Sequence, residues 1–336
     1  MSTPLLAAVL IVKDEAGTLP GCLKSLAGVV NEIHVHDTGS GDGTAEVAER
    51  FGASVTRGTW DGDFGAARNQ AAAGCSAMWV LALDADHRVA TADPGALRGF
   101  LAEATTDAVR VDVADEHHAN PYRHLETRLY RPAAVRWSGR VHERLVRAGG
   151  SVADRGSVPG AVLSLRHLGQ ATAEGCRRRA ERNLALGGRM LDELISQGPQ
   201  ADRERIAGTL LAMGRDSVAA ERWQQGVDTF EVVRDLFPGT PEWMQATDGL
   251  ARLVLATAYD KLCLVLVDQM RDAGADAGYC NWLAAQALAQ LGDPHQAAAL
   301  LSDLTEIVDT AGRRRDPETL RELSTMIDRL RVLAPL

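Results

Sequence analysis

The sequence of 336 residues has few cysteines, and none of them stands in a paired or metal-binding pattern. An odd number of widely spaced cysteines without a CxxC argues against a disulfide framework and against a zinc knuckle. Such usage fits a reducing compartment, so we expect a cytoplasmic protein. The five cysteines are Cys22, Cys75, Cys176, Cys263 and Cys280.

Long apolar runs and basic blocks are missing too. No apolar stretch reaches the length of a bilayer span, and the N-terminal run MSTPLLAAVLIVKDE lacks both a preceding basic region and a small-residue cleavage site. We therefore expect a soluble chain without a membrane span. The formal net charge is -9, and the arginine triplets at 177–179 and 313–315 are short and lie in helical context. These features argue against nucleic acid as a partner.

The first half of the sequence alternates short apolar runs with helical segments. Strands are expected over residues 5–12, 32–36, 54–57 and 78–83, and helices over 18–27, 44–51 and 64–73. This alternation predicts a mostly parallel sheet whose strand ends, and hence a ligand, lie along one edge. From 108 to 167 the apolar residues alternate with polar ones, which predicts further strands with less helix between them.

From residue 172 onward nearly every segment has helical spacing. It recurs over 180–195, 219–236, 250–270 and 282–304, with Gly-Pro or Pro-Gly punctuation at 198–199 and 238–239. Partial matches at Phe230, Pro238 and 287–301 suggest degenerate tetratricopeptide-type repeats, and an irregular helical bundle is the alternative. We expect two domains, residues 1–170 and 171–336.

Acidic and glycine-rich segments follow two of the predicted strands. The segment Asp84-Ala85-Asp86 ends the 78–83 strand, where the turning backbone lets both carboxylates approach one diphosphate-bound Mg²⁺ or Mn²⁺. Taken alone, such a pair is more often a solvated turn. The segment DTGSGDGT ends the 32–36 strand, where Asp37 can accept from a base or a ribose while Asp42 or Thr44 caps the next helix.

These motifs, in this order and at these separations, resemble family 2 glycosyltransferases. The signature consists of DTGSGDGT at 37–44, W-x-x-DFGAARN at 60–69 and LALDAD at 81–86. The match also takes in IVKDE at 11–15, RLYR at 128–131, GRVHE at 139–143, RHLG at 166–169 and RNL at 182–184. It covers about the first 185 residues, and it is strongest to bacterial members with tetratricopeptide-like helices after the transferase domain.

The resemblance implies a hexosyltransferase of the α/β class. Its nucleotide-sugar-binding, mostly parallel sheet would be of the glycosyltransferase A type, followed by an all-α, degenerate tetratricopeptide-like domain. Asp86 would ligate Mg²⁺ or Mn²⁺ directly, and His167 or His142 would be a further ligand. The residues implied to bind the nucleotide are Val12, Asp14, Glu15, Asp37, Arg68 and Asp84.

Inversion at the anomeric carbon needs a base near the acceptor nucleophile and a cation for the departing diphosphate. Glu143 falls where the family places its carboxylate base, although the usual neighbouring Asp of the pair is absent. Asp115 and Glu116 are alternative bases. The adjacent His117 and His118 are expected on an acceptor-side loop.

The sequence therefore predicts an inverting, metal-dependent glycosyltransferase. It would move a sugar from a nucleoside-diphosphate donor, a UDP-sugar, to a hydroxyl or thiol of a sugar, natural-product or peptide acceptor, and could form a homodimer through its helical domain. Two other functions stay open. A nucleotidyltransferase would need a basic, Gly-rich loop where residues 13–17 are acidic. A non-catalytic helical-repeat interaction protein would have little use for so many retained motif residues.

Overall fold

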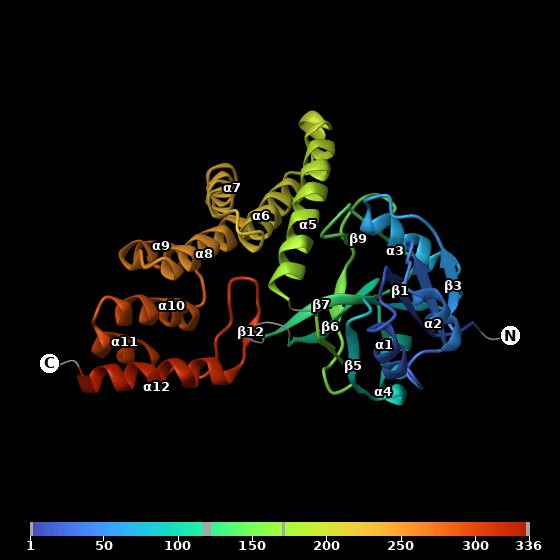
Figure 1. Cartoon of the computed structure of the whole chain (residues 1–336), viewed down its shortest axis with the longest axis horizontal. Coiled ribbons are helices and arrows are strands. Elements are labelled where there is room, and N and C mark those ends of the chain that lie inside the picture. The colour runs from blue at the N-terminus through green and yellow to red at the C-terminus, as the bar shows by residue number, and fades with distance from the viewer. Residues whose placement is uncertain (1–2, 117–121, 170–171, 334–336) are drawn as a thin grey trace. The chain divides into compact units, whose positions relative to one another are not determined.

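The computed structural model describes residues 3–116, 122–169 and 172–333. The chain divides into two compact units (Figure 1). The first comprises Met1–His118 and His124–Ala171, and the second comprises Ala119–Arg123 and Thr172–Leu336. His117 and His118, expected on an acceptor-side loop, lie outside the described residues.

A mixed, mostly parallel sheet forms the first unit, as the sequence predicts. Its strand order is β3-β2-β1-β4-β7-β6-β11-β5, with β10 beside β6, and β8 and β9 pair separately. Strands β3, β2, β1 and β4 are parallel to one another, whereas β7 runs antiparallel to β4 and β5 antiparallel to β11. The strands are β1 (Leu6–Val12), β2 (Glu32–Asp37), β3 (Ser54–Arg57), β4 (Trp79–Leu83), β5 (His87–Ala92), β6 (Ala108–Asp115), β7 (Tyr122–Tyr130), β8 (Val135–Ser138), β9 (Arg144–Arg147), β10 (Arg155–Ser157) and β11 (Leu163–His167).

Apolar side chains on both faces explain why the central strands read as continuous hydrophobic runs. All five residues of β4 are buried, as are six of the seven in β1. Leu10 enters a core shared with Leu19, whereas the adjacent Val9 enters a second core that holds Ala71 and Tyr130. Successive side chains of a strand point to opposite faces, so each face needs its own cover. The helices of this unit are α1 (Leu19–Ser25), α2 (Thr44–Arg50), α3 (Phe64–Ala72) and α4 (Pro94–Glu103).

The second unit consists mostly of helices, most of them joined by short connections, with a longer segment between α11 and α12 (Figure 1). One short strand, β12 (Arg314–Arg315), pairs antiparallel with Tyr122 and Arg123, which belong to the same unit. No helix in the described part of the chain is both long and apolar enough to cross a membrane. The α-helices are α5 (Ala173–Ile195), α6 (Arg203–Ala219), α7 (Trp223–Leu236), α8 (Pro241–Ala256), α9 (Asp260–Asp272), α10 (Ala277–Gln290), α11 (Pro294–Leu301) and α12 (Pro317–Leu333).

Two of the segments predicted as single helices each contain parts of two helices in the structure. Residues 250–270 span the end of α8 and most of α9, and 282–304 span α10 and α11. The first break has neither Gly nor Pro: Ala258 adopts φ 59 at the turn, and the amide of Tyr259 donates to the carbonyl of Val254 at 2.8 Å. Both helices of a pair face the same core. Apolar spacing therefore continues across the turn and hides it from a sequence reading.

Phe230 on α7 shows how closely these helices approach. A Cβ on Gly214 of α6 would lie 2.6 Å from its ring, and a Cβ on Gly249 of α8 would lie 2.8 Å from it. Both distances are shorter than real Cβ contacts, so only glycine fits at these two positions without movement. Close helix pairs of this kind support the expected tetratricopeptide-like character.

Candidate active site

Strand register brings several predicted residues to one edge of the sheet. Val12 at the end of β1 is the partner of Asp37 at the end of β2, and Leu10 of β1 is the partner of Leu83 at the end of β4. Asp84 follows Leu83 directly, so Asp37 and Asp84 lie on either side of the end of β1. In open sheets with parallel strands, ligands bind beyond these carboxyl ends.

The glycine-rich turn after β2 is bonded to the segment after β1. Asp14, with φ 55, accepts a hydrogen bond from the amide of Gly41 at 2.8 Å, and its own amide donates to Ser40 Oγ at 2.9 Å. Asp37 Oδ1 accepts from the amides of Gly39 at 2.9 Å and Ser40 at 2.7 Å. Both loops are thus ordered by their own side chains.

Glu15 is held at the start of α2. Its amide donates to Thr44 Oγ1 at 2.8 Å, and the next amide, of Ala16, donates to Asp42 Oδ2 at 3.0 Å. Asp42 Oδ1 also accepts from the amide of Thr44 at 3.0 Å, and Gly43 occupies the N-cap with φ 85. The segment that carries Asp14 and Glu15 therefore has a fixed path across the sheet edge.

Arg68 of α3 joins two predicted residues that are distant in sequence. Its Nε donates to Glu143 Oε1 at 2.6 Å and its Nη2 to Asp84 Oδ1 at 2.9 Å, and 9% of its side chain is exposed. Burial alone would lower the pKa of Arg68, but the two carboxylates raise it above its usual value. The guanidinium thus stays charged and fixes both carboxylates.

Asp84 has a second arginine partner. Its Oδ2 accepts from Arg128 Nη1 at 3.2 Å, and Arg128 Nη2 lies 2.9 Å from Glu126 Oε1. Burial opposes ionisation of Asp84, but Arg68 and Arg128 hold its pKa well below the usual value. Because arginines contact both of its oxygens, Asp84 is poorly suited to bind a cation directly.

Asp86 has a different environment, although it is only two residues away. Its Oδ2 lies 3.1 Å from His167 Nε2, and His167 Nδ1 lies 3.4 Å from Asp115 Oδ2. Its Oδ1 is buried and has no hydrogen-bond partner in the described parts of the chain. Burial opposes protonation of His167, yet Asp115 and Asp86 raise its pKa to about 10. The ring of His87 stacks on His167 with centroids 4.8 Å apart.

Asp86 and His167 fit a divalent cation. A buried carboxylate oxygen without a partner is costly, and coordination of an ion would satisfy it. Carboxylate oxygen and imidazole nitrogen are both ligands of divalent metals, and diphosphate oxygens of a donor would supply further ones. Asp115, on the far nitrogen of His167, is placed as an outer partner that orients a ligating histidine.

Three other predicted site residues, His142, Glu143 and Glu116, differ in their surroundings. His142, with φ 49, is exposed in the loop before β9, so it is His167 that the fold brings to Asp86. Glu143 next to it is partly buried against Arg68. Glu116, one alternative base, forms a two-pronged ion pair with Arg166, at 2.6 Å from both Nε and Nη2.

Sequence reasoning assigned no role to three charged or titratable groups of this cluster. They are His87, Glu126 and Arg128. His87 directly follows the DAD segment, and Arg128 begins the RLYR segment, so adjacency to the motifs was the available signal. Only the antiparallel pairing of β7 with β4 shows that Arg128 lies beside Asp84.

The DFGAARN segment also has a structural role. Asn69 accepts from the amide of Trp137 at 3.0 Å and donates to its carbonyl at 2.9 Å, which ties α3 to β8. A Cβ on Gly65 would lie 2.9 Å from the carbonyl oxygen of Gly139. Both contacts position the 139–143 loop that carries Glu143.

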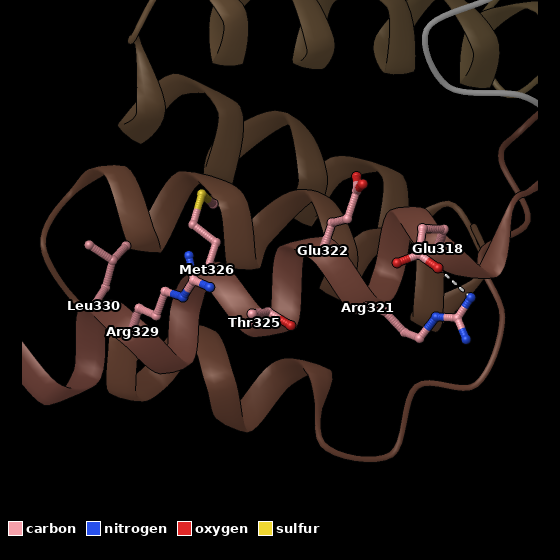
Figure 2. Close-up of a pocket in the computed structure, with 7 residues that line it drawn as sticks. All are labelled: Glu318, Arg321, Glu322, Thr325, Met326, Arg329 and Leu330. Carbon is pink, nitrogen blue, oxygen red and sulfur yellow. Dashed lines mark hydrogen bonds and ion pairs between the residues drawn. The ribbon is translucent and has the colours of Figure 1, made fainter.

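One hollow of the structure contains none of the predicted site residues. It has a volume of about 560 Å³ and lies along α12, as Figure 2 shows. One end of it is charged, with an ion pair between Arg321 and Glu318, and the other end carries Met326 and Leu330 beside Arg329. The expected homodimer through the helical domain stays a prediction. The lining residues are Glu318, Arg321, Glu322, Thr325, Met326, Arg329 and Leu330.

Comparison with known proteins gives relatives that each match only part of the chain. A TPR repeat-containing protein of Synechococcus elongatus is 41% identical over 124 residues, which is 36% of this chain and 30% of that protein. An uncharacterized glycosyltransferase of Rickettsia felis is 33% identical over 84 residues, 25% of this chain and 29% of that protein. The chain thus spans less than a third of the length of these relatives.

Among solved structures, S. aureus TarS aligns over 80% of this chain and 53% of its own, with 13% sequence identity and a TM-score of 0.39. The family model described as Glycosyl transferase family 2 matches residues 7–150. That match takes in the DTGSGDGT, DFGAARN and LALDAD segments, so it supports the resemblance that these motifs predict. Residues 7–150 of this chain are thus similar to glycosyl transferase family 2.

Proposed function

We propose that this protein is an inverting, metal-dependent glycosyltransferase. It transfers a sugar from a nucleoside-diphosphate donor, a UDP-sugar, to a hydroxyl or thiol acceptor. The observation that carries the proposal is Asp86, which has a buried oxygen without a hydrogen-bond partner among the described residues beside His167, within a region similar to family 2. Asp84 and Asp37 follow or end neighbouring strands at the same edge.

The nucleotide would bind across the ends of β1 and β2, where Val12, Asp14, Glu15 and Asp37 lie. The hydrogen bonds that Asp37 accepts from the turn both use Oδ1, so its Oδ2 is the atom we assign to the ribose or base. Because the two loops are already bonded to each other, binding would require little further ordering of the backbone.

Asp86 and His167 would hold Mg²⁺ or Mn²⁺. When bound, such a cation supplies positive charge to the departing diphosphate. His167 would be oriented by Asp115 and by stacking on His87. Asp84, held between two arginines, is assigned to the ribose or to water around the cation.

Arg68 is assigned a positioning role in this proposal. Its Nε and one terminal nitrogen contact Glu143 and Asp84, and the side chain is largely buried. An arginine committed in this way is poorly placed to reach the base or the phosphates directly. It would instead set the distance between Asp84, which faces the donor, and Glu143, which faces the acceptor.

Glu143 is proposed as the general base. It would take the proton from the acceptor hydroxyl or thiol as the oxygen or sulfur attacks the anomeric carbon and the diphosphate leaves from the opposite side. Arg68 fixes the direction of its carboxylate. The alternatives are less suitable, because Asp115 contacts His167 and Glu116 pairs with Arg166.

The acceptor remains the least constrained part of the proposal. Helical repeats commonly present a concave surface to a partner, and the second unit would bind a sugar, natural-product or peptide acceptor in this way. The cytoplasmic location likewise stays a prediction.

A donor screen tests the proposal. The full chain is incubated with UDP-, GDP- and dTDP-sugars, with and without Mg²⁺ or Mn²⁺, and the released nucleoside diphosphate is measured. We expect metal-dependent release from UDP-sugars, and a loss of at least about a hundredfold in Asp86→Asn. Glu103→Gln, an exposed carboxylate on α4, is the control and should retain full activity.

Two outcomes would contradict the proposal. One is that no sugar nucleotide is hydrolysed under any condition, which would favour a non-catalytic interaction protein. The other is that a nucleoside triphosphate, and not UDP, raises the melting temperature in the presence of Mn²⁺, which would favour a nucleotidyltransferase.

A further inference from the structure

Three potential metal ligands meet at the end of the sheet opposite the candidate active site. Glu32 and His34 are two apart on β2, so their side chains share one face of the strand. Cys75 comes from the turn after α3. Glu32 begins β2 and Asp37 ends it, and five steps along a strand cover about 16 Å. This cluster is therefore distinct from the Asp86 site.

The two distances from Glu32 match those between neighbouring ligands of one ion. Glu32 Oε1 lies 3.4 Å from His34 Nε2 and 3.4 Å from Cys75 Sγ. One ligand atom from each residue lies within 4.8 Å of the others. In a tetrahedral zinc site, bonds of about 2.0 Å to nitrogen and oxygen and 2.3 Å to sulfur put neighbouring ligand atoms roughly 3.3 to 3.7 Å apart.

The imidazole of His34 is largely buried in this cluster. Its Nε2 lies 3.4 Å from Glu32 Oε1, without the geometry of a hydrogen bond to any described residue, and 12% of its side chain is exposed. A buried ring nitrogen without a partner is costly unless something occupies its lone pair or proton. The nitrogen lies on the side of Glu32 Oε1, where an ion between the three residues would satisfy it.

Backbone amides hold the central carboxylate in place. Glu32 Oε1 accepts from the amides of Ser76 at 3.0 Å and Ala77 at 3.1 Å. Such outer hydrogen bonds orient ligands in metal sites. The carboxylate of Glu32 is 26% exposed, which leaves a route from solvent.

We propose that Glu32, His34 and Cys75 form a second metal site, selective for a borderline-soft divalent ion of the Zn²⁺ class. Oxygen, nitrogen and sulfur together favour Zn²⁺ or Co²⁺ over Mg²⁺ and Mn²⁺, which prefer oxygen. Water fills the fourth position. On binding, the Cys75 thiol releases its proton to solvent and the thiolate coordinates the ion.

The location gives such an ion a structural effect. It would link the start of β2 to the turn between α3, which carries Arg68, and β4, which precedes Asp84. An ion that binds only the folded state raises its stability. The proposal is independent of the sugar-transfer function, because none of its ligands belongs to the candidate active site.

Cobalt absorption tests the proposal directly. The full chain is stripped with a chelator and titrated with Co²⁺ in the absence of nucleotide. We expect one equivalent to produce thiolate-to-cobalt charge-transfer absorption, which Zn²⁺ then abolishes. Cys75→Ser should lose this absorption, and His34→Ala should weaken binding by at least about tenfold. Cys176→Ser, in the other unit, and Asp86→Asn should both retain it.

A second measurement covers the case in which the variants fail to fold. In the wild-type chain, Zn²⁺ should slow alkylation of Cys75, and not that of Cys176, as read by mass spectrometry of peptides. The proposal is overturned if Co²⁺ gives no thiolate absorption, if the absorption survives in Cys75→Ser, or if Zn²⁺ leaves alkylation of Cys75 unchanged.

Discussion

Asp248 and Asp86, one aspartate from each unit, show two ways in which carboxylate oxygens are satisfied. In the helical unit, Asp248 accepts from the Tyr279 hydroxyl at 2.6 Å through Oδ1 and from Thr310 Oγ1 at 2.7 Å through Oδ2. Arg252 adds an ion pair at 3.3 Å. In the α/β unit, Asp86 has one oxygen beside His167 and another that lies 3.6 Å from His87 Nδ1 and has no hydrogen-bond partner among the described residues.

The difference separates a structural carboxylate from one suited to a ligand. Asp248 connects α8, α10 and the segment before β12, and both of its oxygens are used within the protein. The fold thereby uses its bonding capacity fully, and the residue contributes to packing. The second oxygen of Asp86 is left for a group from outside. Asp248 is fully buried and Asp86 only partly, and the two also differ in how many of their oxygens accept hydrogen bonds.

Among the variants that test this comparison, we expect Arg68→Gln to have the largest effect on activity and stability. Loss of the guanidinium leaves Glu143 and one oxygen of Asp84 without their charged partner. Donor turnover should fall by about a hundredfold or more, and unfolding free energy should fall by about 3 kcal/mol. Initial rates and denaturant melts measure the two effects. Arg98→Gln, exposed on α4, is the matched control; wild-type rates in Arg68→Gln would refute the positioning role.

Asp248→Ala should lower stability without lowering activity. It leaves the buried Tyr279 hydroxyl and Arg252 without their acceptor, so unfolding free energy should fall by about 3 kcal/mol. Donor hydrolysis below the melting temperature should be unchanged, because the residue lies in the helical unit. Asp235→Ala, exposed on α7, serves as the control in the same melts. A loss of hydrolysis at unchanged stability would reverse our assignment of the two aspartates.

A smaller effect is expected from glycines of the helical unit. In Gly249→Ala the new Cβ would lie 2.8 Å from the Phe230 ring, and overpacking should cost about 1 to 3 kcal/mol. Gly208→Ala on α6 has no atom within 4 Å of the added Cβ, so its higher helix propensity should stabilise the protein by up to about 1 kcal/mol. Urea melts of both variants give the comparison. The packing argument fails if the two substitutions shift the midpoint in the same direction.

The smallest intervention is to label thiols in the unmodified protein. Burial raises the pKa of Cys22 in the first unit to about 12, and those of Cys263 and Cys280 in the second to about 12 and 11. At pH 8 these groups are thiols and should react slowly until their unit unfolds, whereas the partly exposed Cys176 should react first. Peptide mapping over a denaturant series then reports the stability of each unit. Rapid labelling of Cys22 in the native state would contradict its burial.

Much of the α/β unit could be predicted from the sequence. The segments at 5–12, 32–36, 54–57 and 78–83 closely match β1, β2, β3 and β4. For β1 and β4 the reason is that strands buried on both faces are apolar throughout. The motif segments at the ends of these strands could also be found, since parallel strands share a carboxyl edge. The helix boundaries after residue 250 were harder to predict, because the turn at Ala258 contains neither Gly nor Pro.

The partners of the site residues could not be predicted in the same way. Arg128 reaches Asp84 from an antiparallel strand 44 positions later, and Glu143 reaches Arg68 across 75 positions. No local pattern encodes such pairings. The cluster of Glu32, His34 and Cys75 was missed for the same reason, since its cysteine has no CxxC partner in the sequence.

The amino-acid sequence by itself determined the order of the strands along the chain, the positions of the acidic motifs at their ends and the change to helices near residue 170. Those features follow from local periodicity and turn chemistry, which act over a few residues. Only the tertiary structure decided that two arginines contact Asp84 while one oxygen of Asp86 has no hydrogen-bond partner among the described residues. The physical reason is that hydrogen-bond satisfaction of a buried group depends on which distant strands lie next to it.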